Sequence, residues 1–164
     1  VGVVAEAVDD LGIAPARIVI THGDPDHVAG LAGLVERFDL ETWVPEGVEV
    51  AVDVDHRFGD GDRVGSFTAV SVPGHTESHH ALVDEDAGVA VIGDALFGSD
   101  ARGLPAGYFV LPTAHYSADL ATADASLARL LEYDFDVGLV YHGSSVTGGA
   151  SEKIAAFVDF AGKR

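Results

Sequence analysis

Two histidines and two aspartates stand within six consecutive residues near the start of the chain. The stretch reads THGDPDH over residues 21–27, and its four metal-ligand side chains are His22, Asp24, Asp26 and His27. Imidazole nitrogen and carboxylate oxygen are ligands that suit zinc, iron and manganese. Alternate residues of one loop can share a side. His22, Asp24 and Asp26 would then face one way and His27 the other, which could serve two metal ions.

Three further ligand-type residues follow separate runs of apolar residues. His75 lies in PGHT, Asp94 in GD and His142 in HG, each at or just beyond the end of such a run. The glycines beside them allow tight turns and a close approach of the backbone. If the apolar runs are strands whose ends share one edge of a sheet, these side chains converge on one spot with those of residues 22–27.

The other four histidines carry less weight, because a single histidine near a strand end is most often a surface or turn residue. His56 is assigned to the surface, whereas His79, His80 and His115 are left open between supporting the site and lying in solvent. The stretch DPD taken alone would also fit a turn with a helix cap. The prediction of a metal site therefore depends on the combination of all four stretches.

Hydrophobic periodicity predicts the elements that must position these residues. Helices are expected over residues 3–11, after His27, over 119–132 and over 151–161. Their expected inward positions are Val4, Ala7, Val8 and Leu11, then Leu31, Leu34, Val35 and Phe38, then Leu120, Leu127, Leu130 and Leu131, and finally Ile154, Phe157 and Val158. Strands are expected over residues 17–20, 42–44, 48–54, 67–72, 81–83, 89–92 and 136–140. Residues 98–118 are expected to form a loop over the site, and the mixed order of elements indicates one α/β domain.

The chain is strongly acidic, with 27 Asp and Glu against 9 Lys and Arg and a net charge of -18. Such a surface repels nucleic acid and anionic membranes, so we expect a small-molecule substrate and neither of those partners. The acidic residues are scattered and not gathered in one block, which favours an acidic shell suited to a high-salt cytoplasm. An ordinary acidic protein is the alternative to a halophile, and a homodimer is left open.

Cysteine and methionine are both absent. Disulfides, thiolate metal sites and cysteine nucleophiles are therefore excluded. No apolar run approaches the roughly 18 residues that span a bilayer, and the first residues do not resemble a signal peptide, so we expect a cytoplasmic location. Because an open reading frame begins with methionine, we expect Val1 to be internal to a longer chain.

Four stretches in chain order resemble the metallo-β-lactamase superfamily: THGDPDH at 21–27, PGHT at 73–76, GD at 93–94 and HG at 142–143. More narrowly, they resemble its glyoxalase II-like hydrolases. The resemblance extends over about residues 2–160. It implies an αββα sandwich, in which two mixed β-sheets are flanked by helices and the metal site lies along one edge.

The resemblance also implies roles for individual residues. It implies two metal positions, held by His22, Asp24 and His75 and by Asp26, His27 and His142, with Asp94 bridging the two. Thr76 and His79 match positions that support the ligands. The cofactor implied is one or two zinc ions, with iron or manganese as alternatives, and the chemistry is metal-assisted hydrolysis of an ester, thioester or lactone. Asp26 would orient the attacking water or accept its proton, and Tyr116, Tyr141 or His115 could donate a further hydrogen bond.

Two features depart from the family pattern. Position 24 usually carries histidine, and here Asp24 adds negative charge and a harder oxygen donor. This change predicts a weaker Lewis acid at the first position and makes manganese or iron more competitive, and a mononuclear site is left open. The strands that normally precede the first helix are missing. We therefore expect residues 1–164 to form a single metallo-β-lactamase-like domain that lacks its usual first strands.

Two other functions stay open at the level of the sequence. One is oxidation of a thiol persulfide at a single iron, a dioxygenase chemistry of the same superfamily. The other is a domain that binds a metal without turnover, which the aspartate at position 24 and the missing first strands would favour. Nuclease activity is disfavoured by the net charge of -18.

Overall fold

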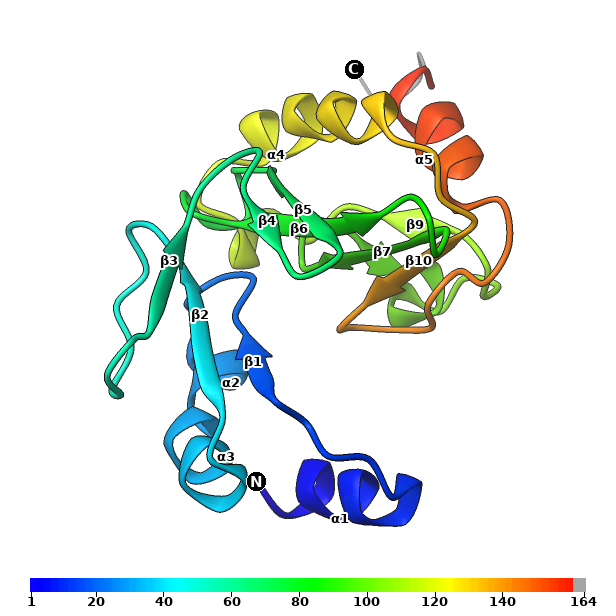
Figure 1. Ribbon diagram of the computed structural model, residues 1–164. Coiled ribbons are helices and arrows are strands. Elements are labelled where there is room, and N and C mark those ends of the chain that lie inside the picture. Colours follow the sequence, from blue (N-terminus) through cyan, green and yellow to red (C-terminus); the bar gives the residue numbers. More distant parts are fainter. Residues whose placement is uncertain (161–164) are drawn as a thin grey trace.

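Two β-sheets lie between helices in the computed structural model of the protein, which describes residues 1–160 (Figure 1). The elements are α1 (Gly2–Leu11), β1 (Arg17–Val19), α2 (Pro25–Val28), α3 (Leu31–Phe38), β2 (Glu41–Pro45), β3 (His56–Phe58), β4 (Arg63–Val64), β5 (Phe67–Ser71), β6 (His80–Asp84), β7 (Val89–Gly93), β8 (Phe97–Gly98), β9 (Phe109–Val110), α4 (Leu120–Ser126), β10 (Val137–Val140) and α5 (Ala150–Val158). Three 3-10 helices are η1 (Ser99–Arg102), η2 (Ala114–Tyr116) and η3 (Leu127–Glu132).

The two sheets differ in size and in strand direction. The smaller sheet has the order β1-β2-β3, and its three strands run parallel. The larger sheet has the order β10-β7-β6-β5-β4. In it β10 and β7 are parallel and the other neighbours antiparallel, so this sheet is mixed. Strands β8 and β9 form a separate short ribbon.

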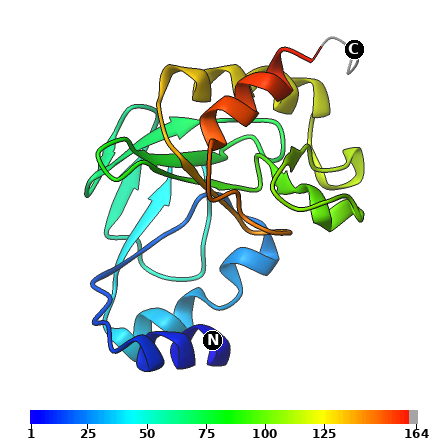
Figure 2. The same ribbon diagram turned by 90° about the vertical axis from the view of Figure 1, so that its right-hand side faces the viewer.

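Three apolar clusters fill the spaces between the layers. The largest lies between the larger sheet and α4, η3 and α5, and includes Leu127 and Ile154. A second lies between the sheets and includes Leu82, and a third joins the smaller sheet to α3 through Val44 and Leu31. Figures 1 and 2 both show α4 and α5 beyond the larger sheet and α1 and α3 at the opposite end of the molecule. This succession of layers confirms the predicted αββα sandwich, although the smaller sheet is parallel and not mixed as expected.

The four predicted helices are present, but two of their predicted inward faces are wrong. The last helix, expected over residues 151–161, is α5 and ends at Val158, and residue 161 lies outside the described residues. In α1, Val4 and Leu11 are exposed and Ala5 is the buried residue. The predicted helix over 119–132 changes from α4 into the 3-10 helix η3 at Leu127, where the period drops from 3.6 to about 3.0 residues per turn. Leu131 is therefore turned toward solvent, with 41% of its surface exposed. Leu120, the first residue of α4, was also expected to face inward and is exposed.

The predicted strand over 48–54 is also wrong, because residues 46–55 form a loop between β2 and β3. Val48 is buried in the cluster beside α3, and the alternate valines that follow it are half-buried against the same cluster. The alternation of valine with polar residues thus indicates only that one side of the segment is buried. A loop can bury one side in this way without pairing to a neighbouring strand. The loop ends at Asp55, whose carboxylate accepts hydrogen bonds from the backbone N–H and the hydroxyl of Thr42, both at 2.8 Å.

The remaining predicted strands are present, and 81–83 and 89–92 lie in the antiparallel hairpin of β6 and β7. Within residues 1–160, no helix combines the length and the apolar character needed to cross a membrane.

Candidate metal centre

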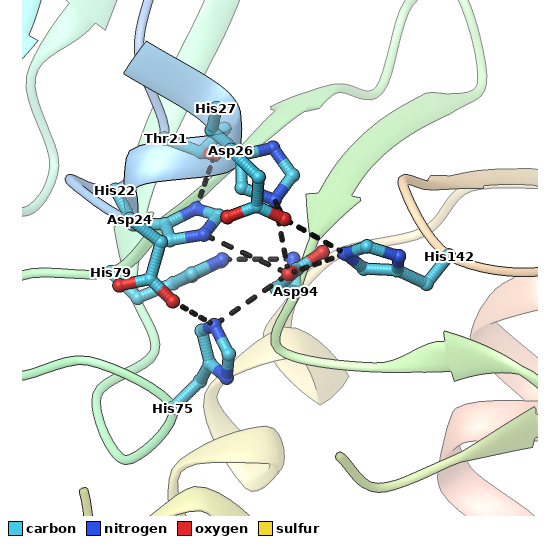
Figure 3. A network of polar contacts seen from close by, with 9 residues as sticks. All are labelled: Thr21, His22, Asp24, Asp26, His27, His75, His79, Asp94 and His142. Atoms are coloured by element: carbon cyan, nitrogen blue, oxygen red, sulfur yellow. Dashed lines mark hydrogen bonds and ion pairs between the residues drawn. The ribbon is translucent and has the colours of Figure 1, made fainter. Parts of the chain in front are cut away.

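The seven predicted site residues meet where four strands end. Residues 22–27 follow β1 of the smaller sheet, while His75, Asp94 and His142 follow β5, β7 and β10 of the larger sheet. In Figure 3 their side chains point toward one another around Asp94. The centre therefore lies where the edges of both sheets come together.

One oxygen of Asp94 is at the middle of this arrangement. Its Oδ2 lies 3.7 Å from Nε2 of His22, 3.3 Å from that of His27, 3.6 Å from that of His75 and 3.2 Å from that of His142. Asp94 is buried, with 2% of its surface exposed. Four imidazoles thus direct the same ring nitrogen toward a single carboxylate oxygen.

The ligand atoms fall into groups in which all lie within 4.8 Å of one another. The groups are His22, Asp24 and His75, then Asp26, His27 and His142, and then His22, His27 and Asp94. The first two are the sets that the sequence resemblance implied, and the third places Asp94 between them. The structure brings all seven residues together, and their role as ligands stays a prediction.

The chemistry of these donors fits a divalent cation. Burial, followed by the neighbouring His27, lowers the pKa of His22 to about 4, so its ring is neutral near pH 7. Among residues 1–160, neither Nε2 of His22 nor Nε2 of His75 makes a hydrogen bond, although both are buried. A buried polar atom without a partner is costly. A cation between these lone pairs and the carboxylates would satisfy them together.

Charge in the centre favours the same conclusion. Burial acts to raise the pKa of the Asp94 carboxyl, but contact with His27, His142 and His22 outweighs it, and this pKa is lowered. Contact with the Asp94 carboxylate in turn raises the pKa of His27. The centre therefore holds an ionised aspartate surrounded by imidazoles.

His79 supports Asp94 from behind. It is fully buried, and its Nε2 accepts a hydrogen bond of 3.0 Å from the backbone N–H of Asp94. Burial lowers the pKa of His79 well below its usual value, so the ring stays neutral and keeps this acceptor. Gly93 has φ 59°, and a Cβ there would lie 2.9 Å from Nε2 of His79. The supporting role implied for His79 thus has a structural basis that requires glycine at position 93.

The histidines that the sequence left open or assigned to the surface contact other parts of the chain or solvent. His80 is buried against Phe58, and its Nδ1 lies 3.0 Å from a backbone carbonyl oxygen. His115 is exposed, and His56 pairs with Glu41 at 2.7 Å on the smaller sheet. The hydroxyl of Thr76 is buried but makes no hydrogen bond within the described residues, so the support implied for it is not seen.

A pocket of about 420 Å³ opens beside the centre. It is lined by Asp24, Asp26, His75, Asp94, Phe97, Tyr116 and His142. Tyr116 comes from the segment 98–118, which was expected to cover the site, and the ring of Phe97 lies 4.7 Å from that of His142. A ligand in this pocket would meet both aromatic side chains and the carboxylates and imidazoles of the centre.

The sequence analysis missed one residue that contacts the histidines and misplaced another. Thr21 was not predicted, yet its Oγ1 lies 3.0 Å from Nδ1 of His22. Tyr141 was one of three candidates for a further hydrogen bond, but it does not line this pocket, and its ring lies 4.9 Å from the ring of His27. Their position in the chain beside His22 and His142 was the available signal.

Comparison with known proteins relates this chain to one superfamily. Residues 5–59 match the model of the metallo-beta-lactamase superfamily. The hydroxyacylglutathione hydrolase of Xanthomonas euvesicatoria pv. vesicatoria (strain 85-10) is 36% identical over 99 residues, which cover 57% of this chain and 38% of that protein. That of Erythrobacter litoralis (strain HTCC2594) is 40% identical over 81 residues, or 47% of this chain and 32% of the relative. The matched segments span less than half the length of these relatives.

Solved structures extend the similarity to nearly the whole chain. TTHA1623, crystallised in a di-iron-bound form, has a TM-score of 0.71 at 24% identity, covering 92% of this chain and 81% of that one. BLEG-1 B3 metallo-beta-lactamase has a TM-score of 0.69 at 16% identity, covering 89% of this chain and 78% of that one. At these identities the similarity shows the fold. The chain therefore has the metallo-β-lactamase fold, and about its first third matches the superfamily itself.

Proposed function

We propose that this chain is the metal-binding part of a hydrolase that cleaves an ester, thioester or lactone bond in a small molecule. The observation that carries the proposal is the single Asp94 oxygen with four imidazole Nε2 atoms 3.2 to 3.7 Å away, beside a pocket. The relatives named hydroxyacylglutathione hydrolases favour the thioester among these bonds.

The donors would hold one or two divalent ions. His22, Asp24 and His75 would hold one, Asp26, His27 and His142 the other, and Asp94 would bridge them. Ions bound there would supply Lewis-acid activation of a carbonyl group and of a water molecule. Zinc suits the imidazoles, and the carboxylates Asp24, Asp26 and Asp94 make iron and manganese competitive.

Asp26 is the residue best placed to handle a proton. Its side chain is 62% exposed, and it lines the pocket. Its Oδ2 lies 3.4 Å from Nε2 of His27 and 3.7 Å from that of His142. We assign Asp26 to orienting the attacking water and accepting its proton.

The aromatic side chains of the pocket would complete the substrate site. Phe97 and Tyr116 line it together with the carboxylates and imidazoles. Their rings would exclude water from the reacting bond and contact the acyl group, and the Tyr116 hydroxyl could donate a hydrogen bond to the substrate. His79 would hold the backbone of Asp94 in place throughout.

A substrate panel tests the proposal. The protein, loaded in turn with zinc, manganese and iron, is assayed with an S-hydroxyacylglutathione, an aryl ester and a lactone. We expect cleavage of at least one substrate, and a fall of at least about 100-fold in kcat/KM for Asp94→Asn and His142→Ala. Glu77→Gln removes an exposed carboxylate near Asp24 and should retain the wild-type rate.

Absence of cleavage in every metal form would refute the hydrolase. Oxygen uptake with a thiol persulfide by the iron form would instead support the dioxygenase. Metal binding without any turnover would identify a binding domain.

A further inference from the structure

His22 has a hydrogen-bond partner on the side of its ring that faces away from the centre. Its Nδ1 lies 3.0 Å from Oγ1 of Thr21, and both residues are buried, with 0% and 2% of their surfaces exposed (Figure 3). Its Nε2 faces Oδ2 of Asp94 at 3.7 Å. One ring nitrogen of His22 therefore contacts the protein scaffold and the other faces the cluster of donors.

Tyr141 adds a second contact behind the same residues. Interaction with Thr21 acts to lower the pKa of the Tyr141 hydroxyl, although burial outweighs it and this pKa is raised. Its ring packs against the imidazoles of His27, at 4.9 Å between centroids, and of His22, at 6.4 Å. Because Tyr141 directly precedes His142, it connects the end of β10 to the histidines that follow β1.

Thr21 is itself held by both sheets. Its carbonyl oxygen accepts a hydrogen bond of 2.9 Å from the backbone N–H of His80, the first residue of β6. The preceding residue, Ile20, donates its N–H to the carbonyl of Trp43 in β2 at 2.9 Å. The hydroxyl of Thr21 is thus presented from a fixed backbone, which is what orienting a ring requires.

His75 differs from His22 in lacking a hydrogen-bond partner at Nδ1 within the described residues. Its Nδ1 is buried and makes no hydrogen bond within residues 1–160. Within residues 1–160 no acceptor therefore holds the proton of His75 on Nδ1, whereas Oγ1 of Thr21 can accept a proton from Nδ1 of His22.

We propose that Thr21 and Tyr141 are positioning residues that fix the ring orientation and the tautomer of His22 for metal binding. The inference rests on the metal centre proposed above. The Nδ1–H of His22 donates to Oγ1 of Thr21, and the Thr21 hydroxyl donates in turn to the Tyr141 oxygen. This direction leaves the lone pair of Nε2 free for the ion, while the ring of Tyr141 limits rotation of His22 and His27.

Conservative substitutions separate this role from packing. Thr21→Val keeps the shape and removes the hydroxyl, Thr21→Ser restores the hydroxyl, and Tyr141→Phe keeps the ring alone. Zinc and cobalt affinities are measured by competition with a chromogenic chelator, together with the absorption spectrum of bound cobalt. Thr113→Val is the matched control, because the Thr113 hydroxyl is also buried but makes no hydrogen bond among the described residues.

We expect Thr21→Val to weaken metal binding by about 10- to 100-fold and to alter the cobalt spectrum. Thr21→Ser should bind like the wild type, Tyr141→Phe should show a smaller loss, and Thr113→Val should show none. Melting temperatures of the metal-free variants report whether the fold is retained. If Thr21→Val binds as tightly as the wild type, the positioning role is refuted while the metal centre stands.

A wild-type protein that binds neither metal would refute the centre and this inference together. If Thr21→Val fails to fold, nitrogen-15 NMR of the zinc-loaded wild type tests the proposal through the exchange rate of the His22 Nδ1 proton. A His22 Nδ1 proton protected from exchange supports the proposal, and a rapidly exchanging one overturns it.

Discussion

At the scale of single residues, Asp24 gives the two proposed metal positions the same types of donor. Its Oδ2 lies 3.1 Å from Nε2 of His75, and each half offers two imidazoles and one carboxylate, with Asp94 shared. Carboxylate oxygen is a harder donor than imidazole nitrogen. The first half should therefore bind manganese and iron relatively better than a site with histidine in place of Asp24.

Substitution of Asp24 by histidine tests this preference. We expect Asp24→His to raise the ratio of the manganese Kd to the zinc Kd by about ten-fold, a difference of about 1.4 kcal/mol. Both constants are measured by calorimetry with competing chelators. Glu77→Gln removes a nearby exposed charge without removing a proposed ligand, and its ratio should stay at the wild-type value. An unchanged ratio in Asp24→His would show that Asp24 is not a ligand.

The types and order of residues sufficed to predict which side chains would meet. All seven came together because each follows the end of a strand, and strand ends are readable from apolar runs. The direction of a hydroxyl is not readable in this way. Thr21 was therefore missed, and Tyr141, one of three candidates for a further hydrogen bond, packs against His27 instead.

At the scale of elements, the turn after β7 decides where Asp94 lies. Gly93 has φ 59°, and it brings the backbone N–H of Asp94 to Nε2 of His79. An added Cβ would lie 2.9 Å from that nitrogen. The turn thus needs glycine both for its backbone conformation and for the space that His79 fills.

Alanine at this turn should disturb the fold and the centre together. Gly93→Ala carries the strain of a left-handed residue, about 1–2 kcal/mol, and also displaces His79. We expect a lower free energy of unfolding in urea and a metal affinity at least about ten-fold weaker. Gly61→Ala is the matched control, because Gly61 has φ 81° but nothing within 4 Å of its added Cβ. It should lose stability alone, and equal metal affinity in both variants would contradict the role given to His79.

Element boundaries were predictable where one period held throughout a segment. The period changed at Leu127, so the inward face of the helix over 119–132 was wrong at Leu131. The alternate valines from Val48 onward were buried as expected but belong to a loop. The pattern of burial alone does not determine whether the backbone of a segment pairs with a neighbouring strand.

At the scale of the whole molecule, the net charge of -18 on 164 residues sets how stability depends on salt. Like charges repel in the compact state, and salt shortens the range of this repulsion from about 10 Å at 0.1 M to about 3 Å at 1 M. The composition also underlies our proposal of a high-salt cytoplasm as its setting.

The melting temperature should therefore rise by several degrees between about 0.1 and 1 M KCl. Differential scanning calorimetry of the metal-free protein measures the change, and sodium chloride at the same ionic strength is the control for a specific ion effect. A melting temperature that stays constant or falls would show that charge repulsion does not limit stability.

The arrangement of the layers was predictable from the resemblance to a family and not from periodicity. Apolar runs indicate strands, but they do not give the order β10-β7-β6-β5-β4 or separate this sheet from β1-β2-β3. Such pairings depend on contacts between residues far apart in the chain.

The centre draws its donors from both sheets, and this has a consequence for the lifetime of the protein. Between the sheets the buried apolar residues are Phe58, Val64, Ala69 and Leu82, a much smaller set than the one beneath α4 and α5. A chelated ion would cross-link the two halves of the sandwich, and its binding energy would oppose their separation. A cell starved of that metal would then lose the polypeptide to proteases, so that metal supply would govern abundance as well as reaction rate.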